Sequence, residues 1–196
     1  WARSKELHSL FINQRIAPQQ QAHVLEGFKG FAQAIGVPDY QPNWQMPVSE
    51  HDQSNADELL GTERLEGRIF VISPAASKKE RNWLAERYAS DDIIAATTTP
   101  ILNLVGKTKL KELLCVLKRA ALVLAPDTGP AHMAVTVGTP VIGLYAHSNP
   151  KRTGPYLYQN YVVEVYHQNL LKQTGKTAER LPWGTRVKGS DIMSQI

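Results

Sequence analysis

The stretch ALVLAPDTGPAHMAVTVGTPVIGLY, residues Ala121–Tyr145, most constrains what this chain can fold into. It opens on a short, wholly apolar run, which is typical of a strand buried on both faces of a parallel sheet. A polar turn follows, and Pro130 stands at the expected first helical position, where its missing N–H does no harm. A short helix that ends at Gly138 and a second apolar run, VIGLY, complete the pattern. The stretch therefore predicts a strand–turn–helix–strand unit of an α/β fold.

The predicted turn carries polar side chains at the start of the helix. Asp127 and Thr128 lie in the turn itself, and His132 lies in the first helical turn. Unpaired backbone amides and the helix dipole make such a helix N-terminus attractive to anions. The set is suited to hold a diphosphate while it contacts a sugar. A purely structural interpretation also stands, because Asp and Thr are common N-caps and a single helical His is usually structural.

Composition limits the classes of partner. The net charge of +4 favours anionic partners. Basic and aromatic residues do not alternate as a stacking platform for nucleic acid requires, so a nucleotide diphosphate or an anionic glycolipid fits better. The chain contains no apolar run of about 18 residues that would span a membrane. Its single cysteine, Cys115, excludes an intrachain disulfide and is expected to be buried and inert in a reducing compartment.

Several other kinds of site can be set aside. The two GKT triplets are not P-loops, because Ile101 and Leu170 stand where each would need a glycine. The dinucleotide fingerprint G-x-G-x-x-G and the hydrolase motif G-x-S-x-G are both absent from the sequence. Six histidines without H-x-x-x-H spacing and one cysteine argue against a zinc site. Phosphate handling by backbone amides and scattered side chains, without a metal or other cofactor, remains.

Three stretches carry a resemblance to a known family. DTGPAHMAVTVGTPVIGLYAHSNPKRTGPY, which begins at Asp127, resembles the signature of glycosyltransferase family nine, the bacterial lipopolysaccharide heptosyltransferases. Val71–Ala89 is similar to the strand–loop–helix that opens the family's nucleotide-sugar domain, and Ala2–Val37 to its crossing between two domains. The resemblance implies an α/β fold of the GT-B type, in which Rossmann-like domains contain parallel sheets.

The resemblance also divides the chain. Residues 1–37, mostly helical, are expected to be the end of an N-terminal acceptor domain with its crossing helix. Residues 38–55 are predicted to be a polar, proline-containing linker without helical period. Residues 56–196 are expected to form the nucleotide-sugar-binding domain, with strands at RIFVIS, ALVLA, VIGLY and YVVEVY, a strand and turn at TPILNLVG, and an amphipathic helix at KTKLKELLCVLKRA.

The resemblance implies a site for a nucleotide-sugar donor. Thr128 and Gly129 are expected to bind the diphosphate, and Asp127 to bind sugar hydroxyls. Arg81 is expected to pair with a phosphate, and Asn103 to contact the ribose. The full set of expected donor-binding residues is Ser73, Ala75, Ala76, Ser77, Arg81, Asn103, Asp127, Thr128, Gly129 and His132. Within it, the loop from Ser73 to Ser77 faces the turn, and where the two alanines stand only backbone contacts are expected.

The function that the resemblance implies is transfer of heptose, with inversion, from ADP-heptose to the lipopolysaccharide inner core. Such an enzyme is expected in the cytoplasm, in peripheral contact with the inner membrane. The family's catalytic base is an aspartate near the start of its N-terminal domain, and that region has no counterpart here, so the catalytic residue is unknown and this chain alone is expected to be inactive. The alternatives are a nucleotide-sugar-binding module without catalysis and a family-nine enzyme that uses another sugar.

One stretch departs from the expected alternation of strands and helices. After Tyr88 the chain continues as polar SDDIIAATTTP, where a doubly wound domain should place another strand. The unit before the following strand is too short for a βαβ crossover. The resembling family has an additional strand and helix at this point. We therefore predict that residues are missing between Tyr88 and Asp91.

Overall fold

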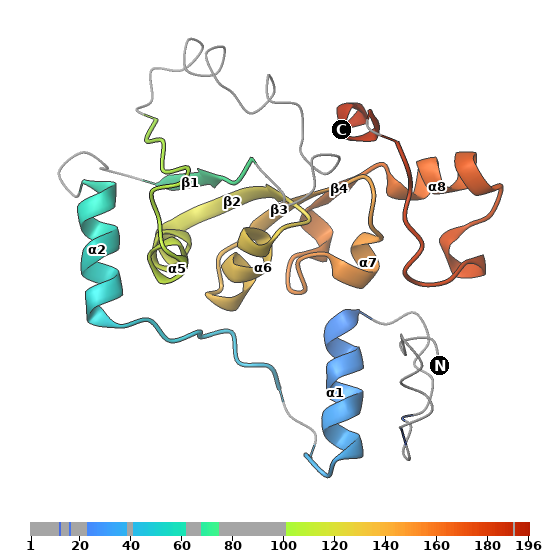
Figure 1. The fold of residues 1–196 in the computed structure, drawn as a ribbon, viewed down its shortest axis with the longest axis horizontal. Helices are drawn as coiled ribbons and strands as arrows, with labels where there is room; N and C mark the ends of the chain where they lie inside the picture. The colour runs from blue at the N-terminus through green and yellow to red at the C-terminus, as the bar shows by residue number, and fades with distance from the viewer. Residues whose placement is uncertain are drawn as a thin grey trace. The chain divides into compact units, whose positions relative to one another are not determined.

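The computed structural model describes residues 12, 16, 23–38, 41–61, 68–74, 101–189 and 191–196 (Figure 1). The chain forms two compact units, Trp1–Gln41 and Pro42–Ile196, and each is described by itself. The boundary falls inside the stretch that the sequence predicts as a linker. In the first unit, helix α1 covers Val24–Ala34, and its N-cap His23 accepts a hydrogen bond from the Leu25 N–H at 3.2 Å. Helix α1 confirms, for the described part of residues 1–37, the prediction that this stretch is helical.

The second unit contains a parallel four-stranded sheet in the order β1-β2-β3-β4. Its strands are β1 (Ile69–Ile72), β2 (Ala120–Pro126), β3 (Val141–Tyr145) and β4 (Val162–Glu164). They lie where the sequence places RIFVIS, ALVLA, VIGLY and YVVEVY, so these predictions are confirmed. The central strands β2 and β3 pack apolar residues on both faces of the sheet, as buried parallel strands do.

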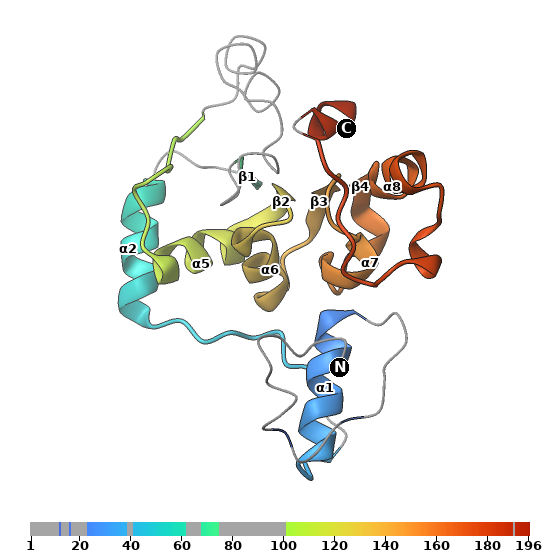
Figure 2. The ribbon, with the colours of Figure 1, turned by 45° about the vertical axis from the view of Figure 1, so that its right-hand side comes forward.

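Two helices cover one face of the sheet. They are α5 (Leu110–Arg119) and α6 (Gly129–Thr136), which lie next to each other beneath β2 and β3 (Figures 1 and 2). Their core includes the fully buried Leu117, and Val123 and Ala125 from β2 point into it. The Thr139 hydroxyl donates to the Leu117 carbonyl at 2.8 Å, which joins the end of α5 to the start of β3. The same core includes Ala131, Ala134 and Val135 of α6, so the helix is packed against the sheet.

The opposite face is packed by the C-terminal part of the chain. Leu124 and Ile142 contact a second core there, to which helix α8 (Tyr166–Thr174) contributes Tyr166 and Leu170. The described residues after β3 also form helix α7 (Pro150–Thr153) and the 3-10 helices η3 (Gln159–Tyr161), η4 (Ala178–Arg180) and η5 (Ile192–Gln195). Alternate residues of β2 therefore face different cores, as the period of a strand requires.

Two local predictions are wrong. Helix α2 (Glu50–Leu60) begins inside the stretch predicted as an irregular linker. A capping box starts it: the Asp52 N–H donates to the Ser49 hydroxyl at 3.1 Å, and the Ser49 N–H donates to the Asp52 carboxylate at 3.2 Å. The helix buries only Ala56 and Leu60, beside the buried Cys115 of α5, so it shows little apolar period.

The second error concerns TPILNLVG. Its described part, residues 101–106, contains the expected turn, in which the Lys107 N–H donates to the Leu104 carbonyl at 3.0 Å, but no strand. The side chains of Ile101 and Leu102 are exposed. Because these two side chains are not buried, their packing does not stabilise a strand at this point.

A tyrosine within β3 anchors the segment that follows the strand. Tyr145 is fully buried, and its hydroxyl donates to the Thr153 carbonyl at the end of α7 at 3.0 Å. Its ring lies over Gly143, two residues earlier on the same face, where a Cβ would come within 2.8 Å of the ring. The segment from Ala146 to Gly154 is thus held close to the end of the sheet.

Candidate functional site

The turn between β2 and α6 forms the centre of the candidate site. Thr128 is the N-cap residue of α6, and Pro130 stands in the first helical turn. Because proline has no N–H, Gly129 and Ala131 supply the first amide donors of the helix. Thr128 occupies the cap position as the structural interpretation requires, yet its side chain makes no cap hydrogen bond. The helix N-terminus is therefore not closed by its own cap.

The Thr128 hydroxyl is buried without a partner. The residue is 8% exposed, and its Oγ1 has no hydrogen bond within the described part of the chain. In contrast, the space in front of Gly129 is open among the described residues, because a Cβ there would meet no atom of them within 4 Å apart from its chain neighbours and its own helix backbone. A buried hydroxyl without a partner is unfavourable unless a ligand or water supplies one. These features fit an anion that docks at the start of α6.

The carboxylate of Asp127 is held in place from two sides. The Ser148 hydroxyl donates to its Oδ2 at 2.6 Å, and His132 Nε2 lies 3.7 Å from its Oδ1. The Asp127 side chain is 13% exposed and that of His132 is half-exposed. The structure thus brings Asp127, Thr128, Gly129 and His132 together, as their sequence spacing predicts. Ser148 is a residue that sequence reasoning missed, although it follows the next predicted strand and so belongs to the same edge of the sheet.

Buried polar atoms without partners gather at this edge. Among the described residues four such side-chain atoms are found, and each follows the carboxyl end of β2, β3 or β4: Thr128 Oγ1, His147 Nε2, Asn149 Nδ2 and His167 Nε2. Native proteins contain few buried polar groups without a partner. Their position at one edge of a parallel sheet, where ligands of such folds bind, supports this edge as the functional one.

The other predicted site residues divide into two groups. Ser73 follows β1, and its N–H donates to the Leu124 carbonyl at 2.9 Å, so it lies at the same edge. Asn103 accepts a hydrogen bond from the Val105 N–H at 3.0 Å within an exposed turn, and its predicted contact with a ribose stays a prediction. Outside the described residues lie Ala75, Ala76, Ser77, Arg81, Tyr88, Asp91 and Asp92.

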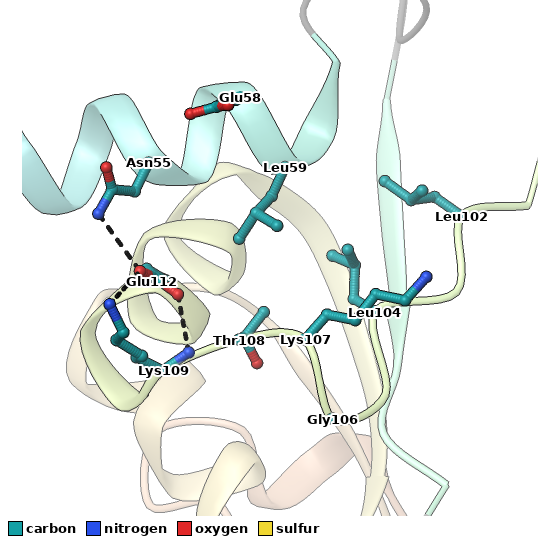
Figure 3. Close-up of a pocket in the computed structure, with 10 residues that line it drawn as sticks. All are labelled: Asn55, Glu58, Leu59, Leu102, Leu104, Gly106, Lys107, Thr108, Lys109 and Glu112. Carbon is teal, nitrogen blue, oxygen red and sulfur yellow. Dashed lines mark hydrogen bonds and ion pairs between the residues drawn. The ribbon is translucent and has the colours of Figure 1, made fainter.

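A hollow of about 730 Å³ lies between α2, the first turn of α5 and the turn at Gly106 (Figure 3). Two carboxylates, Glu58 and Glu112, line it, and Glu112 accepts hydrogen bonds from the Lys109 N–H at 2.8 Å and from Asn55 Nδ2 at 3.3 Å. The bond from the Lys109 backbone is the main cause that holds the pKa of Glu112 below its usual value. Because Glu112 already has partners on both sides, it caps α5 and joins it to α2. We interpret this hollow as structural.

Neither a metal cluster nor a membrane span is found in the described residues. No group of three or more His, Cys, Asp or Glu side chains within the described ranges is placed to hold a metal ion. In the same part of the chain, no helix has the length and apolar character needed to cross a membrane.

Comparison with known proteins identifies relatives of the whole chain. The chain is 40% identical to the lipopolysaccharide core heptosyltransferase OpsX of Haemophilus influenzae over 220 residues, which cover 99% of this chain and 62% of that protein. It is 24% identical to lipopolysaccharide heptosyltransferase 3 of Escherichia coli, over 66% of this chain and 46% of that protein. The chain thus spans less than two thirds of the length of these relatives.

Solved structures show a similar fold. A family 9 glycosyl transferase from Veillonella parvula has a TM-score of 0.65 at 20% identity and covers 84% of this chain and 55% of its own. The E. coli heptosyltransferase WaaC with ADP has a TM-score of 0.53 at 20% identity and covers 81% and 54%. At this identity the likeness concerns the fold, and with the parallel sheet it confirms the predicted α/β class of the GT-B type.

The family match covers nearly the whole chain in two stretches. The family described as glycosyltransferase family 9 (heptosyltransferase) matches residues 1–92 and residues 90–183. The stretches meet where residues are predicted to be missing, between Tyr88 and Asp91, and the alignment with the H. influenzae relative is longer than the chain itself. The two stretches overlap at residues 90–92, and the lack of family residues at that point stays a prediction. From the extent of the match, the chain belongs to glycosyltransferase family 9.

Proposed function

We propose that this chain is the donor-binding half of an inverting glycosyltransferase that moves heptose from ADP-heptose to the lipopolysaccharide inner core. Relatives named as lipopolysaccharide heptosyltransferases support the reaction, and the solved structure of E. coli heptosyltransferase WaaC with ADP supports the donor class. The observation that carries the proposal is the unpaired, buried Thr128 hydroxyl beside the open space at Gly129. Both lie at the start of α6, where an anion is favoured.

The proposed role of each residue follows from the chemical groups at the carboxyl end of the parallel strands. The diphosphate binds the Thr128 hydroxyl and the Gly129 amide, so that charge is stabilised where the leaving nucleotide develops it. Asp127 accepts hydrogen bonds from the sugar, and His132 lies beside the nucleotide. Arg81 pairs with a phosphate as a fixed cationic fork. Asn103 contacts the ribose, and the loop from Ser73 to Ser77, with its backbone at Ala75 and Ala76, faces the turn.

The rest of the enzyme is proposed from the family alone. Residues 1–37 are the end of the acceptor domain, 38–55 the connection and 56–196 the donor domain. We assign no catalytic base to this chain and expect it to bind the donor without turnover. We place the enzyme in the cytoplasm, at the inner membrane, where its anionic glycolipid acceptor is made. A nucleotide-sugar-binding module without catalysis, or a family member that uses another sugar, remains the alternative.

A titration of the chain with ADP, ADP-heptose and UDP-sugars tests the donor class. We expect ADP and ADP-heptose to bind and UDP-sugars to bind more weakly. Mg²⁺ is normally held by oxygen ligands such as paired carboxylates, whereas the proposed turn holds one carboxylate, Asp127, already bonded to Ser148. The positive end of α6 takes over the electrostatic role, so EDTA should leave ADP affinity unchanged. Binding that is lost with EDTA and restored by Mg²⁺ would contradict this site.

The substitution Thr128→Val tests the phosphate turn itself. Valine has nearly the shape of threonine and removes a hydroxyl that has no partner in the described part of the free protein. We therefore expect an unchanged or slightly higher melting temperature and ADP binding weaker by about 1–3 kcal/mol. Thr136→Val is the matched control, because the Thr136 hydroxyl donates to the Met133 carbonyl at the far end of the same helix. Equal ADP affinities for the wild type and Thr128→Val would reduce Thr128 to a residue that only begins the helix.

A further inference from the structure

We propose that the segment after β3 recognises the sugar of the donor, with Ser148 as a positioning residue for Asp127 and Asn149 as a hydrogen-bond donor to sugar hydroxyls. This inference rests on the proposed function, because it assigns a part of the same site. Ser148 and Asn149 are both buried, and the bond between Ser148 and Asp127 places the segment directly beside the phosphate turn.

The first step of the argument concerns charge. A carboxylate next to an anion site repels phosphate, so Asp127 is unsuited to contact the diphosphate itself. It is suited to accept hydrogen bonds from hydroxyl groups, and in an ADP-sugar the first of these on the transferred sugar is carried by C2, the carbon next to the one bonded to the diphosphate. The sugar is therefore the part of the donor that Asp127 can bind.

The second step concerns orientation. The 2.6 Å distance between Ser148 Oγ and Asp127 Oδ2 is that of a short, charge-assisted hydrogen bond. It holds one oxygen of the carboxylate against the segment after β3 and leaves Oδ1 on the side of His132. Without the Ser148 hydroxyl the carboxylate could turn about its side-chain bonds. Ser148 thus acts on the sugar through Asp127.

The third step concerns Asn149. Its Oδ1 accepts the Lys151 N–H at 3.0 Å, which identifies the other amide atom, Nδ2, as the donor. That nitrogen has no partner within the described residues, and Asn149 is 2% exposed. A carboxylate acceptor and an amide donor on neighbouring segments complement hydroxyl groups, which both donate and accept. Phosphate oxygens only accept, so this pair is better matched to a sugar.

The segment is also held firmly enough to position these groups. Tyr145 Oη donates to the Thr153 carbonyl at 3.0 Å, and Gln159 Nε2 donates to the Pro150 carbonyl at 3.1 Å. Both bonds connect the segment to β3 or to the residues before β4. The donors and acceptors are therefore in place before a ligand arrives, which lowers the entropic cost of binding.

The test compares ADP with ADP-heptose by calorimetry on the full chain. Ser148→Ala should weaken ADP-heptose binding about tenfold or more, as expected for the loss of a hydrogen bond to a charged group, and change ADP binding less than about twofold. Ser148→Thr keeps the hydroxyl and should restore sugar binding. Asn149→Ala removes the donor without adding charge and should show the same selective loss, while its melting temperature reports the lost bond to the Lys151 N–H. Ser54→Ala, on an exposed part of α2, is the matched control and should bind both ligands as the wild type does.

The outcomes separate the inference from the proposed function. If the wild type binds neither ligand, the proposed function fails and this inference fails with it. If the wild type binds both and the Ser148 and Asn149 variants lose ADP and ADP-heptose equally, or lose neither, the inference alone is wrong. Melting temperatures show whether each variant folds. Should Ser148→Ala unfold, Ser148→Cys, with its similar size and weaker donor, and Asn149→Ala give the same comparison.

Discussion

Replacing Gly129 with valine should abolish ADP binding and leave the chain folded. Within the described ranges, a Cβ at this position would meet no atom within 4 Å beyond its chain neighbours and its own helix backbone, so this part of the fold has room for the side chain. Valine also has a somewhat better helix propensity than glycine. The proposed diphosphate occupies this same space in front of Gly129. A branched side chain there would keep it away from the backbone amides at the start of α6 and from the Thr128 hydroxyl. Losing two such hydrogen bonds to a charged group should weaken binding about a hundredfold or more.

The measurement is ADP affinity by calorimetry together with the melting temperature. Gly129→Ala should show a smaller loss, because its methyl group takes less of the space. Gly184→Val, in an exposed turn where an added Cβ meets only the end of the Arg152 side chain at 4.0 Å, is the matched control and should bind ADP normally. If Gly129→Val binds ADP as well as the wild type does, the start of α6 is not the phosphate site.

The substitution Leu117→Ala should have the largest effect on stability. Leu117 is fully buried in the core between α5, α6 and the sheet. Truncating a buried leucine removes apolar contacts and leaves a cavity, which costs about 2–5 kcal/mol in the free energy of unfolding. Because α6 packs on the same core, we also expect weaker ADP binding near the new melting transition.

Denaturant unfolding followed by circular dichroism measures this effect. Leu110→Ala is the matched control, because Leu110 lies on the same helix and is 71% exposed. It should cost less than about 0.5 kcal/mol, as most exposed substitutions do. Equal losses from the two substitutions would mean that the core between α5 and the sheet contributes little to stability.

The strands of the sheet could be predicted from the sequence because each is an apolar run. Such a run indicates a buried strand even when the strand it pairs with is unknown. The start of α6 could be predicted because Pro130 is a local signal. Helix α2 was missed although its capping box at Ser49 is a local signal, because only two of its residues, Ala56 and Leu60, are buried, against α5, and the helix has no wide apolar face. The hydrophobic pattern was thus sufficient to predict elements with a wide apolar face. It was not sufficient for α2, which is stabilised by few tertiary contacts.

The candidate site shows the same division. The turn before α6 carries Asp127 and Thr128, and the first turn of the helix carries His132. Their proximity therefore follows from the sequence alone. The contact between Asp127 and Ser148 spans 21 positions. It depends on the parallel register in which Pro126 pairs with Leu144, and that register is a property of the folded sheet. The contact of Ser148 with Asp127 therefore follows only once the pairing of β2 with β3 is known.

The packing of Tyr145 over Gly143 has a consequence for how this family member can diverge. Any side chain larger than hydrogen at position 143 would meet the buried ring, so that position can change only after the tyrosine has become smaller. A smaller residue at position 145 would lose the hydroxyl that holds the Thr153 carbonyl, and with it the anchor of the segment that carries Ser148. In evolutionary terms the two positions form a pair, and a change at either one is restrained by its effect on the proposed donor-binding edge of the sheet.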